Sequence, residues 1–338
     1  MTSRRKIFIF IILSVSLFLI SCRNSNRFHI DTQKNGIKVH IHRFDKDLIN
    51  IDTAHTDTEI KKMYGKYPDF FPVFVSEILD VAPSDTDSVA LFIHNFLSDT
   101  TFAKVNREVL KKFSDVSAIE HQLSDAFTYI HYYFPEIRLP EIYFFVSGFN
   151  RSIIIRSPFI AIGSDLYLGA DYPVYKQITY EYLTYTMRPE NIAPDIVSAL
   201  LFSAFPMNSA ENRLLDNMLY RGKIMYLLSV FMPDEKPEIL MGYTPQQWEW
   251  CKQYEREIWA EMIDKKALFS SDFRVMDAYL NEAPFTAPVS QDSPGRVGTW
   301  VGWQIVKSYM DKNKNVSLQQ LVSENNYQQL LEKSDYRP

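Results

Sequence analysis

Histidine is absent from most of this chain, and its absence limits the chemistry that the chain can perform. All seven histidines lie within the first 131 of 338 residues, so the later residues contain no histidine base or histidine metal ligand. Only ten glycines are present, and neither of the glycine-rich phosphate-binding motifs, GxGxxG and GxxxxGKS/T, occurs. The net charge of −5 provides no basic surface for nucleic acid. These absences argue against a nucleotide-binding or nucleic-acid-binding protein.

Cysteine is equally scarce, with one residue at position 22 and one at position 251. Cys22 follows a positively charged start and an apolar run, residues 7–20, which is too short to span a membrane comfortably. The run ends in the sequence LISC, which resembles a bacterial lipobox. We predict that residues 1–21 are a lipoprotein signal peptide, that Cys22 is lipidated, and that residues 22–36 form a tether.

The residues after the cysteine indicate where the lipid anchor holds the protein. Several acyl chains on one cysteine are enough for stable membrane anchoring. The five residues that follow Cys22, RNSNR, contain neither an aspartate next to the cysteine nor an acidic run. By resemblance to lipoprotein sorting rules, this pattern predicts an outer-membrane anchor with the protein facing the periplasm. The membrane, reached through the lipid, is therefore the first expected partner.

The rest of the chain, with 46% hydrophobic residues overall, is long and apolar enough to bury a core. Residues 37–43 alternate as a strand does, and residues 45–135 show helical periodicity. Residues 141–168 are rich in β-branched and aromatic residues separated by turns, which predicts further strands. We predict an α+β fold: a single mostly α-helical domain, residues 37–338, around a small, mainly antiparallel sheet. Residues 37–135 are a candidate N-terminal helical subdomain.

Two helix starts carry the sequence signature of a capping box, in which a hydroxyl residue and a glutamate or glutamine three residues later cap each other's backbone. One pair is Ser117 and Glu120, which begins a helix with a clear apolar stripe. The other is Thr244 and Gln247, with a proline between them at the first helical position. We predict that a helix begins at each pair.

Two further helices are predicted to cross near the middle of the domain. One covers residues 173–187 and is rich in tyrosine, and the other covers residues 293–310 and contains three glycines within eight residues. A glycine inside a helix costs about 1 kcal/mol relative to alanine, so we infer that another backbone approaches closely at these glycines. We expect the two helices to pack together, with Arg296 contacting Glu181, and we expect Gly298→Leu to destabilise the domain.

Several segments, spread over nearly the whole chain, are long and unusual in sequence. They are the lipobox at Cys22, IKVHIHRFDKDL (37–48), DLYLGADYP (165–173), MRPENIAPDIVSALL (187–201), GYTPQQWEWCKQYEREIWA (242–260), APFTAPVSQDSPGRVGTWVGWQIVKSYM (283–310) and NVSLQQLV (315–322). Together they resemble the GldB family, the gliding-motility lipoproteins of Bacteroidetes. The resemblance implies a role in gliding motility and its associated secretion machinery, with other envelope or motility proteins as partners.

The GldB family in turn resembles predicted zinc-dependent proteases of the gluzincin type, whose central helix carries the sequence HExxH. Residues 180–184, YEYLT, stand at that position. Glu181 therefore stands where the general base would be, and Tyr180 and Thr184 stand where the histidine ligands would be. Zinc needs three protein ligands, and phenol and hydroxyl groups are poor substitutes for imidazole. The resemblance implies a protease-like scaffold with no metal, cofactor or catalytic residue, and a vestigial cleft formed by Tyr180, Glu181, Thr184 and Arg296.

Two alternatives to a non-catalytic envelope lipoprotein remain open. The first is a non-standard metallopeptidase-like hydrolase that combines Glu181 with Glu190 or Asp195, or with two histidines of the first strand, His40 and His42. These histidines share one face of the strand, but with no third ligand nearby a solvated face is the simpler interpretation. The second is a periplasmic ligand-binding module with a cleft lined by Tyr180, Tyr182, Trp300 and Trp303. Metal content tests the first alternative, and solvent exposure of the aromatic residues tests the second.

Overall fold

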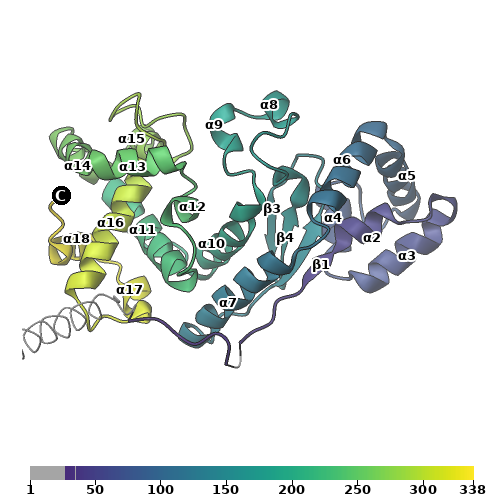
Figure 1. The fold of residues 1–338 in the computed structure, drawn as a ribbon, viewed down its shortest axis with the longest axis horizontal. Helices are drawn as coiled ribbons and strands as arrows, with labels where there is room; N and C mark the ends of the chain where they lie inside the picture. Colours follow the sequence, from purple (N-terminus) through teal and green to yellow (C-terminus); the bar gives the residue numbers. More distant parts are fainter. Residues whose placement is uncertain (1–26, 35) are drawn as a thin grey trace, which may run out of the picture. The chain divides into compact units, whose positions relative to one another are not determined.

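The computed structural model describes residues 27–34 and 36–338 (Figure 1). Residues 27–34 contain turns but neither a helix nor a strand, and they belong to a unit separate from the rest. Residues 36–338 form a mostly helical unit around one four-stranded sheet. The predicted signal peptide and Cys22 lie outside the described residues. Within the two described ranges, no helix has both the length and the apolar character that crossing a membrane requires.

The four strands form a single sheet in the order β1-β2-β4-β3. They are β1 (Ile41–Arg43), β2 (Glu141–Phe145), β3 (Ile153–Arg156) and β4 (Phe159–Gly163). Both β1 and β4 pair with β2 in parallel, whereas β3 and β4 form an antiparallel pair. The prediction of a mainly antiparallel sheet is therefore wrong, because the sheet is mostly parallel.

Strands β2, β3 and β4 lie within the predicted strand region, residues 141–168, whereas β1 covers only the last three residues of the strand predicted over 37–43. The main error concerns which strands are neighbours. Strand β4 lies between β2 and β3, so β2 meets a strand that runs in its own direction. All five residues of β4 are buried, as a strand with neighbours on both sides requires, whereas β3 exposes Ile155 and Arg156 at the sheet edge. Residues 165–168, the end of the predicted strand region, begin instead with a 3-10 turn, η2 (Ser164–Leu166).

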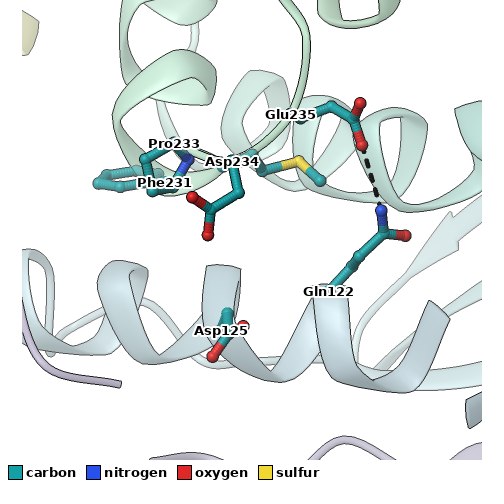
Figure 2. A pocket seen from close by; sticks show the side chains of 7 residues that line it. Gln122, Asp125, Phe231, Pro233, Asp234 and Glu235 are labelled. Atoms are coloured by element: carbon teal, nitrogen blue, oxygen red, sulfur yellow. Dashed lines mark hydrogen bonds between the residues drawn. The ribbon is translucent and has the colours of Figure 1, made fainter. Parts of the chain in front are cut away.

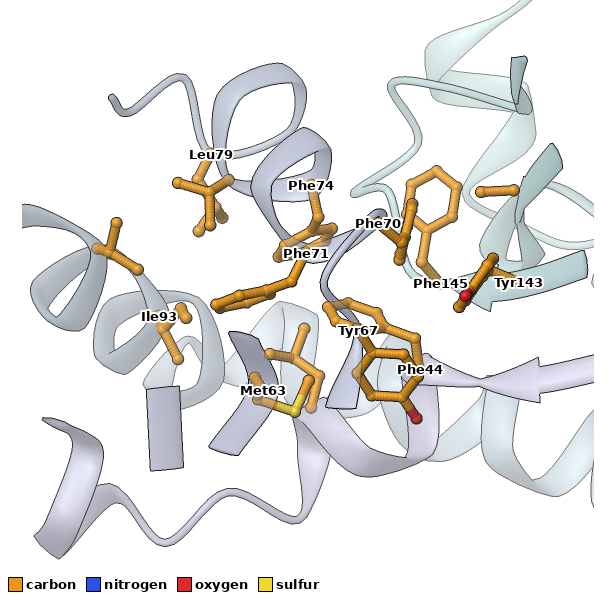
Figure 3. Packing of buried hydrophobic residues seen from close by; sticks show 14 of the residues in the cluster. Phe44, Met63, Tyr67, Phe70, Phe71, Phe74, Leu79, Ile93, Tyr143 and Phe145 are labelled. Atoms are coloured by element: carbon orange, nitrogen blue, oxygen red, sulfur yellow. The ribbon is translucent and has the colours of Figure 1, made fainter. Parts of the chain in front are cut away.

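The helical periodicity of residues 45–135 is confirmed by a series of helices. They are α2 (Phe44–Ile49), α3 (Thr56–Lys66), α4 (Phe71–Glu77), α5 (Thr86–Ser98), α6 (Thr100–Lys112) and α7 (Ser117–Tyr133), with the 3-10 turn η1 (Thr53–His55). Aromatic side chains fill the core between the first of these helices and the sheet (Figure 3). The ring centroid of Phe70 lies 4.9 Å from that of Phe44 and 5.1 Å from that of Tyr143, which belongs to β2.

Helix α7 closes the outer edge of the sheet. Three of its side chains, spaced four residues apart, accept hydrogen bonds from the backbone N–H groups of alternate residues leading into β1. The bonds join Ile37 to Thr128 (2.8 Å), Val39 to Ser124 (3.0 Å) and Ile41 to Glu120 (2.8 Å). Four residues advance about 6 Å along a helix axis, and two residues advance about 6.6 Å along an extended chain. Side chains four residues apart on α7 therefore face N–H groups two residues apart in the segment that leads into β1. The helix begins at Ser117 as predicted, but the predicted capping box of Ser117 and Glu120 does not form, because the cap residue is Val116 and the Glu120 carboxylate binds Ile41 instead.

The second half of residues 36–338 is helical. It contains α10 (Ile192–Ala204), α11 (Leu214–Phe231), α12 (Pro237–Met241), α13 (Pro245–Gln253), α14 (Glu255–Asp264), α15 (Phe273–Leu280), α16 (Val297–Lys312), α17 (Leu318–Ser323) and α18 (Tyr327–Ser334), with 3-10 turns η3 (Pro189–Asn191) and η4 (Ala267–Phe269). The capping box of Thr244 and Gln247 is confirmed, and both of its hydrogen bonds start α13.

The close approach predicted from the glycines of residues 293–310 is confirmed, but the neighbouring helix is not the predicted one. A Cβ atom on Gly302 would lie 2.0 Å from the carbonyl oxygen of Met218 in α11. A Cβ atom on Gly222, also in α11, would lie 2.3 Å from the carbonyl carbon of Gly302. The backbones of α11 and α16 therefore touch at this pair of glycines. The tyrosine-rich segment, which was expected at this crossing, lies elsewhere (Figure 1).

Candidate functional site

The tyrosine-rich segment contains two short helices where one helix over residues 173–187 was predicted. They are α8 (Tyr175–Ile178) and α9 (Glu181–Thr184). Thr179 and Tyr180, which separate them, have extended backbones, with ψ of 171° and 145°. The sequence across the break, ITYEYLTYT, consists mainly of isoleucine, threonine and tyrosine, all of lower helix propensity than leucine or glutamate. The prediction of one continuous helix is wrong because it gave this composition too little weight.

The break separates the residues that stand at the HExxH positions. In that motif two histidines four residues apart share one helix face. Here Tyr180 precedes α9 and is 71% exposed, whereas Thr184 at the end of α9 is buried. Glu181 begins α9 and is exposed. The helical geometry of the motif is therefore absent, in addition to its histidines.

Arg296 does not contact Glu181, so this expected contact is wrong. Its Nε atom lies 3.0 Å from Oε1 of Glu282, and its Nη2 atom donates a hydrogen bond to the backbone oxygen of Met241 at 2.7 Å. Arg296 adopts a left-handed backbone conformation with φ of 60° immediately before α16. The predicted helix over residues 293–310 therefore begins only after Arg296, and this conformation directs the chain into α16.

His40 and His42 lie at the start of the sheet, beside acidic residues. Nδ1 of His40 lies 3.1 Å from Oε1 of Glu120, and the His40 side chain is 79% exposed. Nε2 of His42 lies 3.9 Å from Oε2 of Glu141, and burial lowers the pKa of His42. Within residues 27–34 and 36–338, no three histidine, cysteine, aspartate or glutamate side chains are grouped as a metal site requires.

The predicted aromatic cleft does not form, because its two tryptophans belong to the core. Trp300 and Trp303 are only 1% and 2% exposed, and both rings pack against Trp248. The rings of Tyr180 and Tyr182 instead stack on each other, with their centroids 5.7 Å apart and an angle of 12° between their planes.

The tyrosine-rich segment nevertheless forms one wall of a cavity of about 320 Å³. The apolar lining residues are Phe149, Leu166, Ile178, Leu183 and Met187. The polar lining residues are Ser152, Tyr167, Thr179, Thr186 and Asp195. Tyr180, Glu181, Thr184 and Arg296, which were predicted to form a vestigial cleft, are not among them. The cavity lies beside that segment but is built from different side chains.

Among the described lining residues, Asp195 is the one that carries a charge. It lies in the first turn of α10, and its Oδ2 atom accepts a hydrogen bond from the hydroxyl of Tyr167 at 2.8 Å. Asp195 keeps some accessible surface toward the cavity, yet protein atoms surround it closely enough that burial raises its pKa to about 6. The hydrogen bond from Tyr167 and the positive charge of Arg296 oppose this rise. The sequence analysis considered Asp195 only as a possible partner of Glu181 in a hydrolase site. No sequence pattern pointed to Tyr167.

A second buried aspartate, Asp165, holds the loops around the cavity in place. Its carboxylate accepts hydrogen bonds from the backbone N–H of Ser147 (2.8 Å), the hydroxyl of Ser147 (3.1 Å) and the backbone N–H of Phe149 (2.6 Å). Its backbone oxygen accepts a hydrogen bond from the hydroxyl of Tyr175 at 2.7 Å, which fixes the start of α8. Asp165 thus positions the loop after β2, which contributes Phe149 to the cavity, and α8, which contributes Ile178.

A second cavity, of about 270 Å³, also contains a buried ionisable side chain, Lys223 of α11. The Lys223 ammonium donates hydrogen bonds to the carbonyl oxygens of Val322 (3.2 Å) and Glu324 (2.8 Å). These bonds fasten the end of α17 to α11, and burial lowers the pKa of Lys223 to about 8. Because Lys223 is engaged with the backbone, whereas Asp195 keeps surface toward its cavity, the cavity at Asp195 is the stronger candidate site.

A smaller cavity of about 90 Å³ lies between α7 and the turn after α11 (Figure 2). Two of its three acidic lining side chains, Glu235 and Asp125, already have polar partners. Oε2 of Glu235 accepts a hydrogen bond from Gln122 at 3.1 Å, and Oδ2 of Asp125 lies 3.1 Å from Nδ1 of His121. This cavity holds little more than water, and we do not assign it a function.

Replacing Asp195 with asparagine is expected to increase stability at pH 7 by about 2 kcal/mol. The pKa of Asp195 rises from 3.8 to about 6 on folding, which corresponds to roughly 3 kcal/mol before its partial exposure is discounted. A carboxyl whose pKa is higher in the folded state binds more protons there, so the stability of the wild type falls as the pH rises from about 4 to about 6. A neutral amide lacks this dependence.

Urea unfolding of both proteins at pH 4 and pH 7 measures the effect, because the two proteins share every other titrating group. The advantage of Asp195→Asn is expected at pH 7 and should vanish near pH 4. A variant that is less stable than the wild type at both pH values would show that Asp195 is a structural residue.

The family model of gliding motility protein GldB matches residues 25–338, a range that begins just after the predicted lipidated cysteine. Neither the curated proteins nor the solved structures gave a match to the chain. A likeness to a protease fold is therefore not shown and stays a prediction. Because the family model covers nearly the whole sequence, the chain belongs to the GldB lipoprotein family, the family of gliding motility protein GldB.

Proposed function

We propose that this chain is a non-catalytic lipoprotein of the cell envelope that supports the gliding motility machinery and the secretion system associated with it. Its membership of the GldB family supports the link to motility. Lipid on Cys22 anchors it to the outer membrane, with the folded unit facing the periplasm. Residues 36–338 then act as a protease-like scaffold that binds other envelope or motility proteins.

One observation carries the non-catalytic assignment: the segment where a zinc protease places its metal-binding helix is interrupted at Thr179 and Tyr180. A zinc peptidase needs a glutamate held beside a metal-bound water. Glu181 is exposed on a separate short helix. His42 of β1 lies beside Glu141 instead, and His40, which precedes β1, lies beside Glu120.

Genetic complementation tests this proposal. In the native host, a deletion strain that carries Glu181→Gln is expected to regain the wild-type motility or secretion phenotype, because the glutamate has no catalytic task. Cys22→Ala is expected to fail, because the unlipidated protein is lost from the membrane fraction. A Glu181→Gln variant that is stable, membrane-bound and inactive would overturn the non-catalytic assignment.

The metal content of the purified full-length chain, produced without a histidine tag, tests the hydrolase alternative separately. We expect less than stoichiometric zinc by elemental analysis. One zinc per chain, lost in a His40→Ala, His42→Ala double variant, would support a non-standard metallopeptidase-like hydrolase instead.

A further inference from the structure

Asp195 is a partly buried carboxylate that lines the cavity. Among the described residues its hydrogen bond comes from Tyr167 alone, and no ion pair involves it. The positive charge of Arg296 lowers the pKa of Asp195, but Arg296 is paired with Glu282, whose negative charge raises the pKa of Asp195 again. Buried charges in proteins are normally paired, and an unpaired carboxylate in a cavity marks a candidate binding site.

We propose that this cavity binds a primary ammonium or guanidinium group carried on an apolar stem, with the Asp195 carboxylate as its counter-ion. A cation at this position completes the ion pair that the protein itself leaves unformed. Within residues 27–34 and 36–338, no other charged side chain lines the cavity, so none of these residues favours an anion there.

The cavity walls match both parts of such a ligand. Ser152 and Thr179 also line the cavity, and a hydroxyl oxygen can accept a hydrogen bond from an N–H group of the cation that the carboxylate does not bind. Leu166, Leu183 and Met187 provide an apolar wall for the stem. The volume of about 320 Å³ is at the lower end of ligand pockets, which suits one amine-bearing chain rather than a large ligand.

The site is reachable from solvent along the tyrosine-rich segment. Ile178, in the cavity wall, is 46% exposed, and Tyr180, which follows two residues later, is 71% exposed. Two sources share the required chemistry: a small free amine, and a lysine or arginine side chain presented by a protein. Each source carries an ammonium or guanidinium group at the end of an apolar stem, and the NMR titration described below distinguishes the two sources.

Binding is expected to depend on pH. The charged and titratable groups around Asp195 are Tyr167, Arg296 and Glu282, and the balance of burial with these groups places the pKa of Asp195 at about 6. Because the ligand needs the ionised carboxylate, affinity should be constant above pH 7 and should fall below pH 6. Protonation of the carboxyl at low pH removes the counter-ion.

The test uses the full-length chain in lipid nanodiscs and follows binding by ligand-observed NMR titration. The probes are n-butylamine, the uncharged n-butanol, and Nα-acetyl-L-lysine methylamide. We expect n-butylamine to bind at pH 7 and Asp195→Asn to weaken this binding about tenfold or more. The exposed acid Asp171 provides a matched control, since Asp171→Asn should bind as the wild type does.

A second variant keeps the carboxylate and fills the space. Ser152 is exposed at the cavity wall, so Ser152→Trp is expected to fold and to block n-butylamine. Binding of the acetyl-lysine probe as tight as that of n-butylamine supports a side chain of a partner protein as the ligand, and binding of n-butylamine alone supports a small free amine. Equal binding of n-butanol, or n-butylamine binding unchanged in Asp195→Asn or Ser152→Trp, would overturn the proposal.

Discussion

Replacing Gly302 with alanine is expected to destabilise the protein by about 3 kcal/mol or more, the upper range of overpacking costs. A Cβ atom there would lie 2.0 Å from the carbonyl oxygen of Met218 and 2.6 Å from its carbonyl carbon. These are backbone atoms, so no side-chain rotation relieves the overlap, and α11 and α16 must move apart. Alanine improves helix propensity by about 1 kcal/mol, so any loss measured by urea unfolding comes from the helix crossing.

Two other glycines help to interpret the Gly302 result: Gly65 is a control with free space, and Gly298 is a second close approach. Gly65 lies in α3, and a Cβ atom on it meets no other atom within 4 Å, so Gly65→Ala should stabilise the protein by roughly 0.5–1 kcal/mol. A Cβ atom on Gly298 would lie 2.9 Å from the carbonyl oxygen of Tyr279, so Gly298→Leu should also destabilise. Wild-type stability of Gly302→Ala would mean that the two backbones do not touch.

These glycines show what the sequence can predict and where it stops. A glycine cluster inside a helix predicts a close approach, because its cost to the helix needs a local reason. It does not identify the neighbour, since that depends on contacts between residues far apart in the chain. Gly222, the residue that faces Gly302, is a single glycine within α11 and carried no such signal.

The sheet shows the same limit. Local composition located β2, β3 and β4 within residues 141–168, because strand-forming residues and turns alternate there. The parallel pairing of β2 with β4 arises because β4, and not β3, lies next to β2 in the sheet. The fully apolar sequence of β4, FIAI, favours a buried central strand, but it does not fix the direction of the neighbours.

The candidate site was harder to predict than the fold. The cavity lies beside the break at Thr179 and Tyr180, which the prediction of one continuous helix over residues 173–187 missed. Asp195 carried one local signal, since it is a single acid within the apolar sequence IAPDIVSALL. Its hydrogen bond with Tyr167 joins α10 to the turn after β4, a contact that no local pattern contains.

Asp165→Ala is expected to destabilise the protein by on the order of 4 kcal/mol, because removing an acceptor from several buried donors costs about 1–3 kcal/mol for each. The N–H groups of Ser147 and Phe149 and the Ser147 hydroxyl would all lose their partner. Asp165→Asn is expected to be nearly as harmful, because one carboxylate oxygen becomes an N–H donor that faces other donors. Asp171→Asn, at an exposed site in the adjoining segment, should be neutral in the same urea unfolding assay.

The contrast between the two aspartates distinguishes a structural acid from a binding acid. Burial raises the pKa of both Asp165 and Asp195, so the pKa direction alone does not separate them. The Asp165 carboxylate accepts three hydrogen bonds, and an amide cannot accept all of them because its nitrogen is a donor. The amide variant of Asp165 should therefore lose stability. Asp195 accepts one hydrogen bond, which an amide oxygen also accepts, so its amide variant should gain stability. If both amide variants were destabilised equally, Asp195 would be part of the scaffold, and the cavity would have no unpaired charge to offer a ligand.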